Sequence, residues 1–395
     1  MDRAAIGAFL SENLDWRKRP DAVSILLMLV GAAGLGIGLT YVLGMLMLEG
    51  HSAFNTSSDM AWGAPIAFYL FFLLTSSGLS VIASLDTVFG IRVFHPIAKR
   101  AVFLSIICLI AGFSVLALEI GRPFRMLWSL PLGMQVRSPM FWMGVLYSID
   151  LVLLFVKFWL LHRKDWHSRL SHLVAVVSFV VCILAPGTLG LVFGMMAMRP
   201  AWYSNIMPMY FILTGFTSAV AFLLFFTSLL PQNQQDEPVK GLFDEVLPRL
   251  FFVSLLAVIG MRFGQIITGL WSNMEGLEAA WLQLHSPLFW IEIAAGLLVP
   301  TLLMAFQPVR RLAVVQFLAA ASFMVGIFCG RVEFLIAGQR VPLFRGHWAG
   351  FVDYWPSTTE WMLVPAGIGL MLLLYGLGNW LLRLGDRPAE PAAAE

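Results

Sequence analysis

The chain has 395 residues, of which 59% are hydrophobic and 12% are charged, and its formal net charge is +2. Soluble domains carry roughly 25% charged residues, so the composition excludes a soluble globular protein and indicates a polytopic membrane protein. The basic residues are spread over many loops instead of one face, which excludes a nucleic-acid-binding surface. The predicted fold class is therefore an all-α integral membrane protein.

The first residues show no cleavable signal. Residues 1–20 are mixed in character and end in Trp16-Arg17-Lys18-Arg19, just before the first apolar run. They lack the apolar core and the small-residue cleavage site of a signal peptide. The first hydrophobic span is therefore expected to stay in the mature protein.

About ten apolar runs are long enough to cross a bilayer of about 30 Å. Pro186 and Pro300 could bend or break two of them. An even number of spans places both termini on one side, and the loops on that side hold most of the Lys and Arg residues. We therefore predict a multi-pass membrane protein with a cytoplasmic N-terminus and a cytoplasmic C-terminus. The runs cover residues 22–48, 62–86, 100–119, 139–161, 168–198, 205–230, 246–272, 286–306, 309–334 and 359–384.

An internal repeat is indicated by Ser138-Pro-Met-Phe-Trp142 and Ser286-Pro-Leu-Phe-Trp290, which open the fourth and the eighth run. Four spans separate them, which favours two parallel four-helix bundles, although a shared Ser-Pro preference at helix starts or chance could also explain the match. The predicted organisation is a cytoplasmic segment (1–21), a first span with its outer loop (22–61), a first bundle (62–204), a second bundle with its periplasmic loop (205–358), and a last span with a cytoplasmic tail (359–395).

Ionisable residues gather near the predicted outer ends of the spans. Such groups cost several kcal/mol in a membrane unless they are paired or hydrated, so they are functional candidates by default. The alternative is structural: the arginines could neutralise the carboxylates as ion pairs, and Glu360 could cap a helix N-terminus. The group comprises Glu119, Arg262, Glu292, Arg331, Glu333 and Glu360, with Arg122 just beyond.

A second group of charges lies nearer the predicted inner face. Asp150 and Lys157 are two helical turns apart and so share a helix face. Together with Asp86 they could form a proton path from the inside. They could equally be a lysine that extends to the interface and a buried acid satisfied by a neighbouring hydroxyl.

Metal and haem binding are not expected. Cys108, Cys182 and Cys329 stand singly in apolar runs, without the spacing of a zinc or iron–sulfur site. All seven histidines lie in loops or at helix ends, whereas a bundle that binds b-type haem needs axial ligands within its helices.

Carboxylates, arginines and aromatic residues without a metal suit the chemistry of a quinone. A carboxylate can exchange protons with the ring oxygen, an arginine can stabilise negative charge on the reduced ring, and aromatic side chains can line a flat apolar slot. Electrons would come from a cofactor in another subunit. We predict Glu333, Glu292 and Glu119 as proton-exchanging or quinone-bonding groups, Arg331 and Arg262 as their charge partners, and Tyr354 and Trp62 as slot walls.

Four motifs carry a resemblance to a known family. They are Trp62-Gly63-Ala64-Pro65-Ile66-Ala67, Gly121-Arg122-Pro123, Ser138-x-Met140-x-Trp142-x-Gly144 and Tyr354-x-Pro356-Ser357-x-x-Glu360. With them the sequence resembles, over nearly its whole length, the NrfD/PsrC family of membrane subunits of bacterial respiratory complexes. The last motif is similar to the ten-helix branch, which includes the hydrogenase subunit HybB, the quinone reductase complex subunit QrcD and the subunits of alternative complex III.

The resemblance implies a cofactor-free quinone-binding subunit, with menaquinone favoured over ubiquinone, and for some relatives a proton path across the membrane. It implies a site near the periplasmic side beside a four-cluster, ferredoxin-like iron–sulfur subunit. A multihaem cytochrome c and a molybdopterin-type or hydrogenase subunit are further partners in such complexes, and membrane lipids surround them. It marks as site residues Glu119, the acid ahead of the Gly-Arg-Pro motif, Arg122 within that motif, and Glu360 in the Pro-Ser-x-x-Glu motif. Arg331-x-Glu333 departs from the Arg-x-Asn of hydrogenase-type members and favours the QrcD-like subunits.

Two other functions stay open at this point. Two parallel bundles with buried charges also suit a secondary transporter that works by alternating access. The chain could also be a passive anchor that tethers a redox complex, in which case its outer acids could be neutralised without effect.

Overall fold

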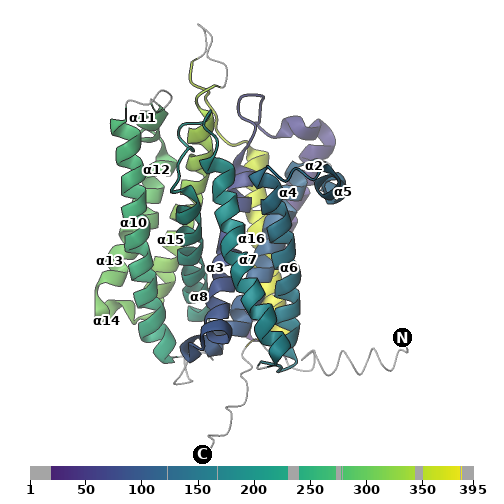
Figure 1. Cartoon of the computed structure of the whole chain (residues 1–395), viewed down its shortest axis with the longest axis vertical. Coiled ribbons are helices and arrows are strands. Elements are labelled where there is room, and N and C mark those ends of the chain that lie inside the picture. Colours follow the sequence, from purple (N-terminus) through teal and green to yellow (C-terminus); the bar gives the residue numbers. More distant parts are fainter. Residues whose placement is uncertain are drawn as a thin grey trace, which may run out of the picture.

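The computed structural model describes residues 19–121, 123–166, 168–229, 240–272, 277, 279–342, 350–382 and 384. Within these ranges ten helical segments are long and apolar enough to cross a membrane. They stand roughly side by side in one bundle (Figure 1). The predicted all-α membrane fold and its number of spans are confirmed.

The spans are formed by long single helices, two of them preceded by short 3₁₀ or π segments and one interrupted by a π segment. In chain order they are α2 (Ala22–Glu49), α3 (Ala64–Phe89), η2 (Arg92–Ile97) with α4 (Ala98–Glu119), α6 (Pro139–His162), α7 (Arg169–Gly194), α8 (Met207–Ser228), η4 (Leu242–Val246) with α10 (Leu247–Trp271), α12 (Pro287–Ile291) with η5 (Glu292–Leu298) and α13 (Val299–Ala305), α15 (Ala313–Gln339) and α16 (Thr358–Leu381). The short helices η1 (Gly50–Ala53), α5 (Pro123–Gly133), α11 (Ala279–Gln283) and α14 (Gln307–Arg310) lie at the ends of the spans.

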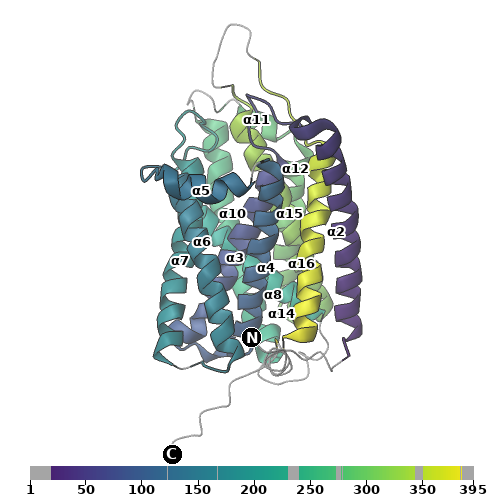
Figure 2. The ribbon, with the colours of Figure 1, turned by 90° about the vertical axis from the view of Figure 1, so that its right-hand side faces the viewer.

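The two terminal spans pack on each other at one edge of the bundle, where Figure 2 shows α2 beside α16. Glycines make this close approach possible. A Cβ atom at Gly38 would lie 2.6 Å from a carbonyl oxygen of α16, and one at Gly369 would lie 2.7 Å from a carbonyl oxygen of α2. Small residues at such interfaces allow helices to associate in lipid, where no hydrophobic force drives them together.

The centre of the bundle is the contact between α3 and α8. Gly78 and Gly215 face each other there, and a Cβ atom on either would collide with the backbone of the opposite helix. Helix α3 also packs against α4 and α7, while α8 also packs against α10 and α15. The contact therefore joins the two predicted bundles, whose boundary near residue 204 stays a prediction.

The two repeat motifs make the same tertiary contact. The indole Nε1 of Trp142 donates a hydrogen bond of 2.9 Å to the carbonyl of Val136, and Nε1 of Trp290 donates one of 2.8 Å to the carbonyl of Leu284. Each tryptophan thus links the first turn of its span, through a hydrogen bond, to the backbone carbonyl six residues earlier. Because the same hydrogen bond recurs in the structure, the two motifs share more than their four identical residues and the Met140/Leu288 pair.

Proline does not interrupt the fifth span, because α7 runs through Pro186 without a break. The irregular span is the eighth, which changes from α-helix to π-helix at Glu292 and returns to α-helix at Val299. Single π turns are frequent at functional sites. Here the π segment begins at one of the predicted site residues.

Helix α15 is longer at its outer end than its apolar run. It continues to Gln339, whereas the run predicted an end at residue 334. At 1.5 Å per residue, Arg331 therefore lies about 12 Å inside the outer end of the helix. Arg331 and Glu333 are both buried, and α15 extends past them, and past the predicted end of the apolar run, to Gln339.

Candidate functional site

Glu360 is held by four groups at the predicted outer end of the bundle, the end at which α4 and α15 finish and α16 begins. Its Oε2 atom accepts hydrogen bonds from the backbone N–H groups of Ser357, at 2.6 Å, and Asn55, at 3.3 Å. Its Oε1 atom accepts a 2.5 Å hydrogen bond from the Tyr354 hydroxyl. Ser357 Oγ in turn accepts from the Glu360 N–H, which completes a capping box. The capping role considered from the sequence is therefore present.

Glu119 is the last residue of α4, and its carboxyl group lies near the Gly63 N–H and the Glu360 carboxylate. Its Oε2 atom is buried and has no hydrogen-bond partner among the residues that the structure describes. No basic side chain in the same ranges forms an ion pair with it. Glu119 thus combines burial, a neighbouring acid and a free acceptor atom. Arg122, which the sequence places nearby, lies outside the described residues.

Tyr354 links the outer loop to this cluster. Its hydroxyl donates to Glu360 and accepts a 3.2 Å hydrogen bond from the Ala64 N–H, the first residue of α3. Burial, followed by the charge and hydrogen bond of Glu360, raises the pKa of Tyr354 above its usual range. The phenol therefore stays protonated and keeps donating at alkaline pH.

Tyr354→Phe is expected to destabilise the folded chain by about 1.5–3 kcal/mol, because a hydrogen bond to a charged group is lost. Folding raises the pKa of Tyr354, so the extra free energy of unfolding of the wild type over the variant is complete below about pH 10, the usual tyrosine pKa. It falls as the pH rises toward the pKa of the folded state. Thermal unfolding of both proteins between pH 7 and pH 11 measures this. An advantage that grows with pH in the alkaline range would contradict it.

Trp62 is fixed through its backbone and its ring. Its N–H donates to Gln339 Oε1 at 3.0 Å, and its carbonyl accepts from Gln339 Nε2 at 2.8 Å. Its ring stacks on Trp202, with centroids 5.4 Å apart, and meets Phe193 edge-on at 5.4 Å. Trp202 therefore covers one ring face, and a role for Trp62 as a slot wall stays a prediction.

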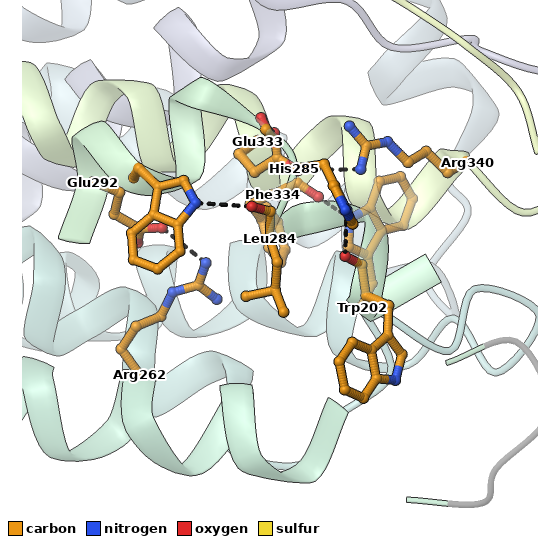
Figure 3. Close-up of polar contacts among 11 residues, drawn as sticks. Trp202, Arg262, Leu284, His285, Glu292, Glu333, Phe334 and Arg340 are labelled. Atoms are coloured by element: carbon orange, nitrogen blue, oxygen red, sulfur yellow. Dashed lines mark hydrogen bonds and ion pairs between the residues drawn. The ribbon is translucent and has the colours of Figure 1, made fainter. Parts of the chain in front are cut away.

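A second group of charges, here called the arginine cluster, consists of Arg262, Glu292 and Arg331. Arg262 reaches from α10 to Glu292 on η5 with a 2.8 Å ion pair (Figure 3), and both side chains are buried. Arg331 donates to the Thr214 hydroxyl, and its guanidinium lies 4.7 Å from the ring centre of Phe211 and 5.3 Å from that of Tyr210. The sequence did not single out these three partners on α8, because nothing in their spacing indicates that α8 faces α15.

Gly330 provides the space for the Glu292 side chain. A Cβ atom at Gly330 would lie 2.7 Å from the Glu292 Cγ atom. Gly330→Ala should therefore displace Glu292 and break its pair with Arg262, at a cost of about 3–5 kcal/mol. Chemical unfolding of the purified protein measures this. Gly264→Ala on α10 is the control: its Cβ would meet nothing within 4 Å, so its stability should be unchanged or slightly higher. Equal stability of the two variants would contradict the prediction.

Glu333 has partners of its own. Ser286 Oγ, from the second repeat motif, donates to its Oε2 atom, and Arg340 Nη1 lies 3.6 Å from its Oε1 atom. Figure 3 shows Arg340 directed toward Glu333. Glu333 is fully buried, within electrostatic reach of Arg262 and Glu292. Arg340, rather than the predicted Arg331, is its close ionic partner.

The inner charges lie in a polar strip between α3, α6 and α7. Lys157 is buried, and its Nζ atom donates a 2.7 Å hydrogen bond to Ser84 Oγ. Asp150 is fully buried, and neither of its carboxylate oxygens has a hydrogen-bond partner in the described part of the chain. Lys157 therefore does not extend to the interface, and the hydroxyl partner belongs to the lysine instead of the acid.

Two further polar groups continue this strip. Asp86 is paired with Nδ1 of His95, whose ring packs on Trp166 with centroids 4.7 Å apart. Toward the outer side, Tyr147 is hydrogen-bonded to Ser77 at 3.4 Å and lies within electrostatic reach of Asp150. His95 was missed by sequence reasoning, although its position in a short loop after Asp86 could have indicated the pair.

Metal coordination finds no support in the described ranges, where no three His, Cys, Asp or Glu side chains gather as a metal ion would require. The predicted site residues instead form three separate groups: the acids at Glu119 and Glu360, the arginine cluster with Glu333 beside it, and the inner polar strip.

Comparison with known proteins finds relatives over most of the chain. The sequence model of the family "Polysulphide reductase, NrfD" matches residues 52–342. A subunit of the selenate reductase of Mesobacillus selenatarsenatis is 23% identical, over 87% of this chain and 90% of that protein. A putative dimethyl sulfoxide reductase membrane subunit of Halobacterium salinarum is 22% identical, over 91% of this chain and 93% of that protein. The Hdr-like menaquinol oxidoreductase integral membrane subunit of Archaeoglobus fulgidus is 23% identical, over 86% of this chain and 89% of that protein. With ten spans and a family match over most of its length, the chain belongs to the polysulphide reductase NrfD family of oxidoreductase membrane subunits.

Proposed function

We propose that this chain is the quinone-reacting subunit of a multi-subunit oxidoreductase, and that the reaction takes place at the outer end of the first bundle. The observation that carries this proposal is the Glu119 carboxyl group, whose buried Oε2 atom has no hydrogen-bond partner among the described residues and lies next to a second carboxylate. Interconversion of a quinone and a quinol moves two electrons and two protons. Glu119 has the free acceptor atom and the shielded position that proton exchange with a ring oxygen needs.

Glu292 and Glu333 were predicted for the same role and stay candidates, but their surroundings suit it less well. Arg262 binds Glu292 directly, and Arg340 with Ser286 flanks Glu333. A neighbouring cation favours the ionised carboxylate. Such a group accepts a proton less readily than a carboxyl group without a cation.

Aromatic side chains lie below Glu119, and we propose that the quinone ring binds against them. Tyr69 is six residues into α3 from Gly63, and Phe113 is six residues before Glu119 on α4, so both lie about 9 Å deeper in the membrane. Their ring centres are 6.1 Å apart. Trp62 and Tyr354 border the same end of the bundle, as slot walls would. Arg122 is proposed from the sequence alone as a further contact.

A proton path can be proposed from this site to the inner face. Tyr69 lies within electrostatic reach of Tyr147, and Tyr147 within reach of Asp150. Asp150 and Asp86 both lie within reach of Lys157. On the outer side, the exposed His51 ring lies against Gly121, two residues after Glu119, where it can exchange protons with water.

Electrons would be exchanged with an iron–sulfur protein on the outer face, which we place in the periplasm with both termini of the chain in the cytoplasm. Helix α2 begins and α16 ends on the same, inner side of the bundle. Menaquinone is the favoured substrate because one relative is named as a menaquinol oxidoreductase subunit. Partners of the molybdopterin, hydrogenase or multihaem cytochrome type remain open within this proposal.

The test is purification of the chain with its natural partners in mild detergent. Mass spectrometry of the associated subunits and of the extracted lipids should find an iron–sulfur protein and a quinone, and the preparation should oxidise menaquinol or reduce menaquinone. A lone chain without quinone that takes up a solute in vesicles would instead establish a secondary transporter. A complex whose quinone turnover survives neutralisation of Glu119, Glu292 and Glu333 would leave only the anchor function.

A further inference from the structure

The arginine cluster contains more positive than negative charge. Arg262 and Arg331 are both buried, and Glu292 is the one carboxylate bound to either of them in the described residues. Arg331 forms no ion pair in that part of the chain; its contacts are the Thr214 hydroxyl and the faces of Tyr210 and Phe211. Arginine stays protonated in proteins, so two guanidinium groups share one carboxylate.

Glu333 does not supply the missing charge. It interacts electrostatically with Arg262, but its own neighbours are Arg340 and the Ser286 hydroxyl. The Nε atom of Arg262 is also buried without a hydrogen-bond partner in the described residues. An uncompensated buried charge is strongly destabilising. The cluster therefore lacks an acceptor with negative charge or a strong dipole.

The cluster lies at a depth that a membrane amphiphile can reach. Arg262 is the last buried side chain of α10, and from Phe263 to Trp271 every residue is at least partly exposed. Arg262 is nine residues, or about 14 Å, below the outer end of that helix, and Arg331 is about 12 Å below the end of α15. Helix α10 packs on α8 and α13, and more weakly on the short helix α11, so the exposed side chains beyond Arg262 leave the last turns of α10 open to lipid.

We propose that the arginine cluster is a second ligand site, in the second bundle, which binds the oxygen-bearing headgroup of an amphiphile from the outer leaflet. The guanidinium groups of Arg331 and Arg262 would donate hydrogen bonds to a phosphate or carbonyl oxygen, which is the chemistry that arginine recognises best. The oxygen could belong to an anionic phospholipid or to a quinone. The site lies apart from Glu119 and does not depend on the function proposed there.

Two substitutions with opposite expected effects test this in the purified complex. Arg331→Met leaves the neutral Arg262–Glu292 pair, so after delipidation its unfolding temperature should equal or exceed that of the wild type. Glu292→Gln leaves two arginines without a carboxylate, so its unfolding temperature should fall. Phosphatidylglycerol or a menaquinone analogue should then raise the unfolding temperature of the wild type and of Glu292→Gln by about 2–4 °C more than that of Arg331→Met, in which only binding elsewhere, such as at the Glu119 site, remains.

The probes distinguish the two sources of the oxygen, with phosphatidylcholine as the reference lipid. A response to phosphatidylglycerol alone that is lost in Arg331→Met identifies a phospholipid, and a response to the menaquinone analogue that is reduced in Arg331→Met identifies a second quinone position. No response to either, or a delipidated Arg331→Met protein less stable than the wild type, would overturn the proposal. If a variant does not fold, photoreactive versions of both probes are bound to the wild type and the labelled helices are identified. Labelling of α10, η5 or α15 supports the site, and labelling confined to other helices refutes it.

Discussion

Replacing Glu119 with glutamine is expected to lower quinone turnover by about 10²- to 10⁴-fold, the usual contribution of a positioned acid or base. Glutamine keeps the size of the side chain and its contact with the Gly63 N–H, but it cannot take up or release a proton. Its effect on folding should be small, because the variant removes a carboxyl group without an observed cationic partner and relieves repulsion from Glu360. Steady-state menaquinol oxidation by the purified complex measures the effect.

The matched control for this substitution is Glu49→Gln. Glu49 ends α2 just as Glu119 ends α4, but its side chain is exposed. Turnover and unfolding temperature of this variant should equal those of the wild type. Normal turnover in Glu119→Gln would remove Glu119 from the mechanism and make Glu333→Gln and Glu292→Gln the next variants to measure. Loss of the partner subunits in Glu119→Gln would instead indicate a structural role.

Asp150→Asn is expected to abolish proton uptake from the inner side while the chain still folds. Its carboxylate is fully buried and lies between Tyr147 and Lys157, so no other acid of α6 can replace it in the proposed path. Complexes reconstituted into vesicles with an internal pH indicator measure protons taken up per electron transferred. In complexes whose inner face is turned toward the vesicle lumen, the indicator should record no uptake coupled to electron transfer, since only exchange at the outer face would remain.

A double variant separates this effect from simple destabilisation. Asp150→Asn alone removes the carboxylate near Lys157, which stays buried with Ser84 as its hydrogen-bond partner. This should lower the free energy of unfolding by about 1–3 kcal/mol. The double variant Asp150→Asn with Lys157→Met removes both charges, so its stability should recover while its proton uptake stays low. Proton uptake that recovers together with stability would refute a path through Asp150.

Much of the fold could be predicted from the sequence, because the bilayer imposes its thickness on each span. Apolar length gave ten spans, and Ser357-x-x-Glu360 marked the start of the last span through a capping box that the structure contains. The end of α15 could not be predicted in this way. Polar Gln339 belongs to the helix because its side chain binds the Trp62 backbone, a contact between residues far apart in the chain.

The sequence by itself therefore determined the class of the protein, its number of spans and the set of ionisable residues near the outer end, because the cost of burying charge makes such residues conspicuous in an apolar chain. Only the tertiary structure decided which of them are paired. Arg262 binds Glu292 across two spans, Arg340 lies at Glu333, and Glu119 and Arg331 have no ionic partner in the described chain. The physical reason is that pairing depends on how each helix is rotated toward its neighbours, and on the π segment at Glu292. Both follow from packing between helices, which the spacing of residues within one helix does not specify.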